Sequence, residues 1–146
     1  MSVGQLGKIR VGQTKAELRA TGQVGPVGPG CEAAGPNAEA AELKVPGTNE
    51  DQLAGNVQLD QGTVIGITIT AGQTVEGVRA GKSYPRGVDT LKAAGYSLQP
   101  DDGTGESFGV TIGQFTKGGK PAYGLVGLPS SGKIESISTP SVVICE

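Results

Sequence analysis

Residues 9–22 read IRVGQTKAELRATG, and residues 78–95 read VRAGKSYPRGVDTLKAAG, so a short chain presents nearly the same stretch twice. In the first copy, Thr14 precedes Glu17 by three residues, which is the spacing of a capping box at a helix N-terminus. Gly22 is placed to end this helix, because glycine readily adopts the left-handed backbone found at helix C-termini. The first stretch therefore predicts a short helix that must dock on a larger element.

The second stretch predicts a longer helix that starts in the same way. Ser83 is the candidate N-cap, and Pro85 is tolerated in a first helical turn. Val88 and Leu91 follow at a spacing of three, which places both on one apolar face. Gly95 is the expected end of this helix.

Two longer stretches read as strand, turn and strand. Residues 55–70, GNVQLDQGTVIGITIT, have their turn at 60–62, and residues 123–139, YGLVGLPSSGKIESIST, have theirs at 129–132. Further strands are expected at 41–45 and 108–115. The alternation of apolar and polar residues predicts antiparallel strands with one covered face and one solvated face.

Together these elements predict an α+β fold. It would consist of two tandem repeats of a short strand, a short helix and three antiparallel strands, which share one core. The repeats would span residues 1–74 and 75–146 and form one compact domain, because each has too little core to fold well alone. Accidental similarity within a glycine-rich sequence is the competing explanation.

The composition limits the classes of partner. The 146 residues carry 12 basic and 14 acidic side chains, for a net charge of −2, with no basic stripe to attract a phosphate backbone. We therefore expect no nucleic-acid partner. No apolar run approaches the length that crosses a bilayer, so we expect no membrane span. Only two Phe, three Tyr and no Trp are present, so Val, Ile, Leu and Ala must build most of the core.

The residue types indicate no catalytic or metal site. The absence of histidine removes the histidine-dependent triads and metal sites. Gly81-Lys82-Ser83 resembles the end of a phosphate-binding loop, but that pattern requires glycine where this chain has Glu76. The acidic stretch PDDGTGES is typical of a solvated turn. Ser130 or Ser131 could form a serine–lysine pair with Lys133, but all three lie in a predicted hairpin turn. We therefore predict a protein that is not an enzyme and has no cofactor.

The two cysteines, Cys31 and Cys145, leave two readings open. They could be unrelated small apolar residues, or they could form a disulfide that joins a Gly/Pro-rich loop to the end of the sequence. A disulfide would imply an oxidising compartment. The opening residues MSVGQLGKIR carry no signal-peptide core, so we expect either a cytoplasmic protein or a mature chain whose signal was removed.

The two helix starts resemble a known repeat. Gly12-Gln13-Thr14 and Gly81-Lys82-Ser83 hold the place of the glycine-methionine-threonine helix start in the tandem-module proteins that inhibit β-lactamases, and in related small outer-membrane-assembly lipoproteins. The stretches GPVGPGCEAAGP, TVEGVRAG, FGVTI and ICE are similar to those of small secreted or lipid-anchored actinobacterial proteins of unassigned activity. This resemblance implies an extracytoplasmic setting and a Cys31–Cys145 disulfide. The inhibitors present aromatic-rich sheets, whereas this chain has five aromatic residues, so inhibition of β-lactamases is not carried over.

These observations predict a secreted or envelope-associated interaction module that recognises a protein partner and can form oligomers. The partner would meet the open sheet face or the loops 24–37 and 97–107, while Phe108 is expected in the core. The candidate partner-binding residues are Val27, Tyr84, Tyr96, Phe115 and Tyr123. The alternative is a structural component of a particle, such as a phage decoration, capsid or tail protein, found in the virion.

Overall fold

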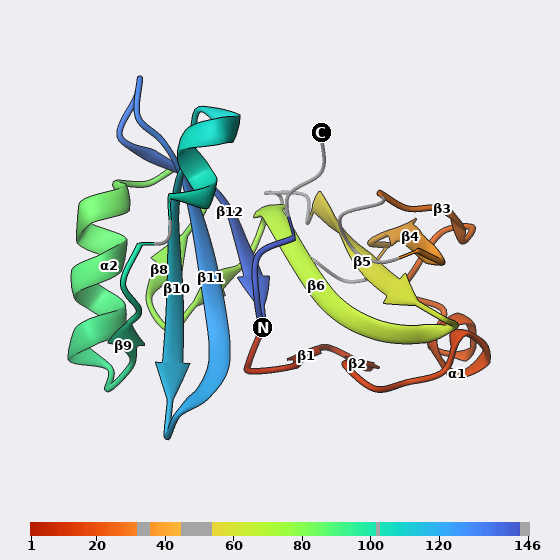
Figure 1. Ribbon diagram of the computed structural model, residues 1–146. Coiled ribbons are helices and arrows are strands. Elements are labelled where there is room, and N and C mark those ends of the chain that lie inside the picture. The colour runs from red at the N-terminus through yellow and green to blue at the C-terminus, as the bar shows by residue number, and fades with distance from the viewer. Residues whose placement is uncertain (32–35, 45–53, 102, 144–146) are drawn as a thin grey trace.

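One antiparallel sheet dominates the fold (Figure 1). The computed structural model describes residues 1–31, 36–44, 54–101 and 103–143, without the side chain of residue 104. Within these ranges, eight strands follow the order β3-β4-β5-β6-β12-β11-β10-β9. Their bounds are β3 Gly28–Pro29, β4 Ala38–Glu42, β5 Ala54–Asp60, β6 Thr63–Ala71, β9 Ser97–Leu98, β10 Thr111–Lys117, β11 Lys120–Leu128 and β12 Lys133–Thr139.

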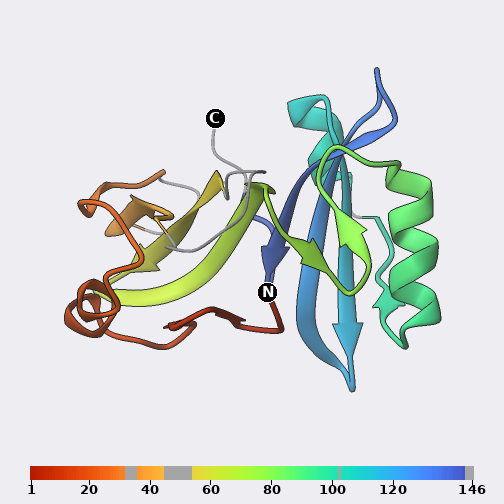
Figure 2. The same cartoon turned by 180° about the vertical axis from the view of Figure 1, so that it is seen from behind.

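The helices lie on the outer side of this bent sheet (Figures 1 and 2). Leu18 of α1 and Leu91 of α2 are buried there in one apolar cluster with side chains of the long strands. Two small hairpins and a short 3-10 helix complete the described part of the chain. The bounds are α1 Lys15–Ala20, α2 Tyr84–Ala93, the 3-10 helix η2 Thr104–Phe108, β1 Gln5–Leu6, β2 Ile9–Arg10, β7 Thr74–Val75 and β8 Val78–Arg79.

The prediction of an α+β fold made of two balanced repeats is wrong. The described α-helices contain only 6 and 10 residues, and the fold is mainly sheet. Strands β2 and β8 lie where a short strand is expected before each helix, and each pairs with a further two-residue strand, β1 or β7, that is too short to produce an alternating sequence pattern. The same shortness concealed edge strands β3 and β9. The boundary expected between residues 74 and 75 falls inside β7.

The predicted helix starts are confirmed. The Thr14 hydroxyl accepts a hydrogen bond from the Glu17 amide at 3.2 Å, and the Glu17 carboxylate accepts one from the Thr14 amide at 3.1 Å. In α2 the Ser83 hydroxyl accepts from the amide three residues later, with a proline in the first turn. Gly22 and Gly95 follow the helices with φ of +69° and +96°, a backbone region that favours glycine.

Backbone hydrogen bonds hold the segment before α1 against the β5–β6 turn. The Gly12 amide donates to Val64 O at 2.8 Å, and the Val64 amide donates to Gln13 O at 2.8 Å. The Lys15 amide donates to Gly62 O at 2.9 Å. The Lys15 bond satisfies the first amide of α1, which has no partner inside the helix.

The segment before α2 makes the corresponding three bonds to the β11–β12 turn. The Gly81 amide donates to Ile134 O at 2.7 Å, and the Ile134 amide donates to Lys82 O at 2.8 Å. The Tyr84 amide donates to Gly132 O at 2.8 Å. The similarity between residues 9–22 and 78–95 thus corresponds to the same mode of helix docking. The Gly81-Lys82-Ser83 motif, which resembles the end of a phosphate-binding loop, uses its backbone to hydrogen-bond to strand β12.

Strands β6 and β12 join the two parts of the sheet. Ile67 pairs with Thr139, and Ile69 pairs with Ile137. On the opposite face of the same strands, the hydroxyls of Thr68 and Ser138 lie 2.8 Å apart. Ile67, Ile69 and Ile137 are at most 1% exposed, so this pairing lies within the core.

Three of the predicted partner-binding residues fill the core beneath α2. Phe115 and Tyr123 are 0% exposed, and Tyr96 is 6% exposed. The Tyr96 and Tyr123 rings meet edge to face with centroids 5.3 Å apart. The Tyr96 hydroxyl donates to Glu76 at 3.0 Å, while no described residue gives the buried Tyr123 hydroxyl a hydrogen bond of good geometry.

Burial makes this core sensitive to alkali. Burial raises the pKa of Tyr123 far above that of a free tyrosine and also raises the pKa of Tyr96, with a further rise from Glu76. The neutral phenols therefore stabilise the folded state below the unfolded-state pKa of about 10. Above it the unfolded state releases protons first, so the free energy of unfolding must fall as the pH rises.

We predict that Tyr123→Phe flattens this alkaline fall. At neutral pH the change should cost less than about 1 kcal/mol, because it removes a buried hydroxyl that lacks a good hydrogen bond. The measurement is urea unfolding of both proteins between neutral pH and pH values above about 10. All other ionisable groups are the same in the two proteins, so their contribution cancels in the difference between the two unfolding free energies. An equal alkaline fall in both proteins would contradict the prediction.

Candidate functional site

The inner side of the bent sheet, opposite the helices, carries mostly polar side chains. Gln58 donates to the side chains of Asn56 and Thr68, the latter at 3.2 Å, and Thr68 continues to Ser138. This chain of bonds runs across β5, β6 and β12. It satisfies polar groups that would otherwise be costly to cover, so the inner side can be partly covered without loss of hydrogen bonds.

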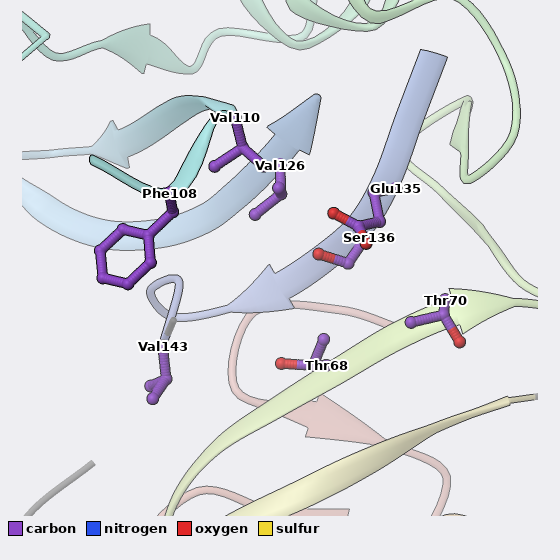
Figure 3. Close-up of a pocket in the computed structure, with 8 residues that line it drawn as sticks. All are labelled: Thr68, Thr70, Phe108, Val110, Val126, Glu135, Ser136 and Val143. Atoms are coloured by element: carbon purple, nitrogen blue, oxygen red, sulfur yellow. The ribbon is translucent and has the colours of Figure 1, made fainter. Parts of the chain in front are cut away.

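A hollow of about 340 Å³, here called the inner hollow, lies over the junction of β6 and β12 (Figure 3). Hydroxyl and valine side chains make up most of its wall, with Phe108 at the end of η2. A register shift opposite Val126 and Gly127 inserts one extra residue in β12, so the neighbours Glu135 and Ser136 both line it. Its lining residues are Thr68, Thr70, Phe108, Val110, Val126, Glu135, Ser136 and Val143.

The segment 140–143 lies on this inner side. Gln114 Nε2 of β10 donates to Pro140 O at 2.9 Å and to Tyr123 O of β11 at 3.1 Å, which ties the segment to these two strands. A Cβ on Gly124 would lie 2.9 Å from the Val142 backbone nitrogen, so only glycine allows this approach. Val143 then lines the inner hollow. The inner side therefore already accommodates an apolar stretch of chain.

A second, smaller hollow of about 200 Å³ lies on the other side of Val143. Glu39 lines it and forms an ion pair with Lys15 at 2.6 Å. Cys31 also lines this hollow and is not a free cysteine. Cys145 falls outside the described residues, so the Cys31–Cys145 disulfide stays a prediction.

The described lining of the inner hollow is mainly apolar and hydroxylic. Glu135 is its only described lining residue that is charged at neutral pH. Among the residues the structure describes, no group of three or more His, Cys, Asp or Glu side chains could hold a metal ion. The hollow offers apolar surface from Phe108 and its valines, with hydroxyls that can donate or accept.

The aromatic residues lie differently from the sequence expectation. The burial of Tyr96, Phe115 and Tyr123 keeps these three off the surface. Tyr84 and Val27 are half-buried and pack against the core. A side chain that anchors a partner must be accessible at the surface, and these three buried side chains are not.

Phe108, which we expected in the core, is 37% exposed at the rim of the inner hollow. The strand expected at 108–115 begins only at Thr111, since η2 holds Phe108. Gly103 and Gly109 flank η2 with φ of +80° and +69°. The glycines around Phe108 in DGTGESFG were the signal for a turn in place of a strand.

Comparison with protein-family models, curated proteins and solved structures finds no match. In the part of the chain that the structure describes, no helix has the length and apolar character needed to cross a membrane.

We predict that Gly124→Ala displaces the segment 140–143. The added methyl meets the Val142 backbone, and overpacking of this kind costs about 1–3 kcal/mol. Gly28→Ala is the matched control, because a Cβ on Gly28 meets nothing within 4 Å. Urea unfolding measures stability, and limited proteolysis with mapped fragments measures access to residues 140–143. Equal stability and cleavage in the two variants would show that Gly124 does not seat the segment.

Proposed function

We propose that this protein is a non-enzymatic binding module that recognises a protein partner through its inner hollow. The observation that carries the proposal is Phe108, a large aromatic side chain 37% exposed at the rim of a hollow with further apolar walls. Aromatic side chains beside a pocket are frequent anchors of protein interfaces. The surrounding hydroxyls would give the partner's polar groups hydrogen bonds.

The chemistry of the hollow favours a protruding loop or extended segment of the partner. The chain's own residues 140–143 support this, since valines of that segment rest against Gly124 and enter the hollow. A partner segment with one apolar side chain could pack between Phe108 and Val126. Its backbone could bond to Thr70 and Ser136, which line the opposite wall.

We place this activity outside the cytoplasm, in a secreted or envelope-associated protein. The state of Cys31, which is not a free cysteine, supports an oxidising compartment. The resemblance of the sequence to secreted and lipid-anchored proteins supports the same setting. Measuring the thiol content of the protein isolated from its own cells tests this placement.

The test of the binding surface starts from a photo-crosslinking amino acid at position 108, with the same residue at Leu98 as control. Leu98 is 38% exposed, so the two positions are equally accessible. Proteins cross-linked in extracts of the source cells are identified and purified. Their affinity is then measured for the wild type, Phe108→Asp and Leu98→Asp.

We expect Phe108→Asp to weaken binding of the partner at least about tenfold, which is typical of an interface anchor. Leu98→Asp should change the affinity less than about twofold, and neither variant should lower the melting temperature. Equal binding by Phe108→Asp and the wild type contradicts the proposal. So does the absence of any adduct at position 108, or an adduct formed only with a second copy of this chain.

A further inference from the structure

The sheet edge formed by β10 is only partly covered. Strand β9 pairs with β10 at two positions, Leu98 with Phe115 and Ser97 with Thr116. One more bond follows, from the Gln99 amide to Gln114 O at 2.8 Å. Edge-directed amides alternate along a strand, so the next one that could continue the pairing is that of Asp101, and it makes no hydrogen bond to the β10 backbone.

Beyond this point the described edge is open at Ile112, because the Val110 amide, two residues earlier on the same side, already donates to Gly105 O of η2 at 3.0 Å. Because the Gln114 carbonyl points toward β9, the amide and carbonyl of Ile112, two residues earlier, point toward the same edge. No described residue hydrogen-bonds to them on that side. The Ile112 side chain turns to the other face, where its Cγ1 lies 3.2 Å from the Cβ position of Gly105. Ile112 therefore offers backbone atoms to the edge.

A groove of about 400 Å³, here called the edge groove, runs beside this backbone between α2 and β10. Tyr84 and Val88 are half-buried on its α2 side, and Leu98 is 38% exposed. The groove therefore has an apolar floor next to an open strand edge. Its lining residues are Tyr84, Pro85, Val88, Asp89, Leu98, Gln99, Asp101, Thr111 and Ile112.

The charge of the edge groove is negative. Asp89 on α2 and Asp101 in the loop after β9 both line the groove. The described lining includes no lysine or arginine. Asp101 Oδ1 accepts a hydrogen bond from the Gly103 amide at 2.8 Å, which orients the carboxylate. Two carboxylates beside an apolar floor favour a ligand that is both cationic and apolar.

The opposite edge of the sheet lacks these features. There β3 carries Pro29, and Gly28 and Pro29 pair with Ala40 and Glu39 of β4. The Gly30 amide continues this pairing to Ala38 O at 2.9 Å. At the other end of β4 the Gly25 amide donates to Glu42 O at 2.9 Å, so the edge of β4 is bonded along its length. The β10 edge is therefore the one suited to pairing.

We propose that the edge groove binds an extended basic segment of another protein, added to the sheet as a strand beside β10. The backbone of the segment pairs with Ile112. Side chains two residues apart face the groove, so the recognised pattern is basic, any, apolar, any, basic. The apolar side chain contacts Tyr84, Val88 and Leu98, and the basic ones face Asp89 and Asp101.

The test uses the acetylated, amidated heptapeptide TKTLTKT as probe and TETLTET as its acidic counterpart. Binding to the full chain is measured by titration calorimetry, and hydrogen exchange of the Ile112 amide is followed by NMR. The variants are Leu98→Lys and the double variant Asp89→Asn/Asp101→Asn. Phe108→Lys is the matched control, because Phe108 is 37% exposed and does not line the edge groove.

We expect TKTLTKT to bind at least about tenfold more tightly than TETLTET, and less tightly at high salt. Leu98→Lys and the double variant should each weaken binding at least about fivefold, while Phe108→Lys should not. Exchange of the Ile112 amide should slow on binding. Melting temperatures of all variants verify that they fold.

Equal affinity for the two peptides, or no binding at about 1 mM, overturns the proposal. Unchanged exchange at Ile112 overturns it as well, because backbone pairing is then absent. Sedimentation that shows dimers in the wild type but not in Leu98→Lys would mean that a second copy of the chain occupies the edge. Partner binding that is unchanged in Phe108→Asp contradicts only the proposal for the inner hollow. Peptide binding that is unchanged in Leu98→Lys contradicts only the proposal for the edge groove.

Discussion

The pairing of β6 with β12 is the interaction on which the rest of the structure depends. It joins strands that are far apart in the sequence, through Ile67, Ile69 and Ile137, which are at most 1% exposed. The inner hollow takes Thr68 and Thr70 from one strand and Glu135 and Ser136 from the other. Without this pairing the chain would have two small sheets, each with little core, and no hollow between them.

The two faces of the sheet have different tasks because side chains alternate along each strand. The outer face buries Val57, Ile67 and Leu125 beneath the helices and hairpins. The inner face carries the amides and hydroxyls that bond across β5, β6 and β12. Partner contact there would depend on side chains, whereas contact at the β10 edge would depend on backbone groups. The inner hollow and the edge groove are therefore independent surfaces.

The local signals were readable in the sequence, and the global ones were not. Thr14 and Glu17 predicted the start of α1 because a capping box needs only neighbours in sequence. The helix–sheet balance escaped prediction because two-residue strands leave no periodic pattern. Exposure of Phe108 and burial of Phe115 escaped it for another reason. Both belong to similar glycine-containing stretches, and only the tertiary position of η2 separates them.

Hydrogen exchange in increasing urea tests the central pairing most directly. Val57 in β5 and Leu125 in β11 lie on opposite sides of the junction and are both 0% exposed. If β6 and β12 make one cooperative unit, the amides of β5 and β11 should open with the same free energy and the same dependence on urea. Opening of the β5 amides at a clearly lower free energy than those of β11 would show that the two parts fold separately, and it would contradict the account.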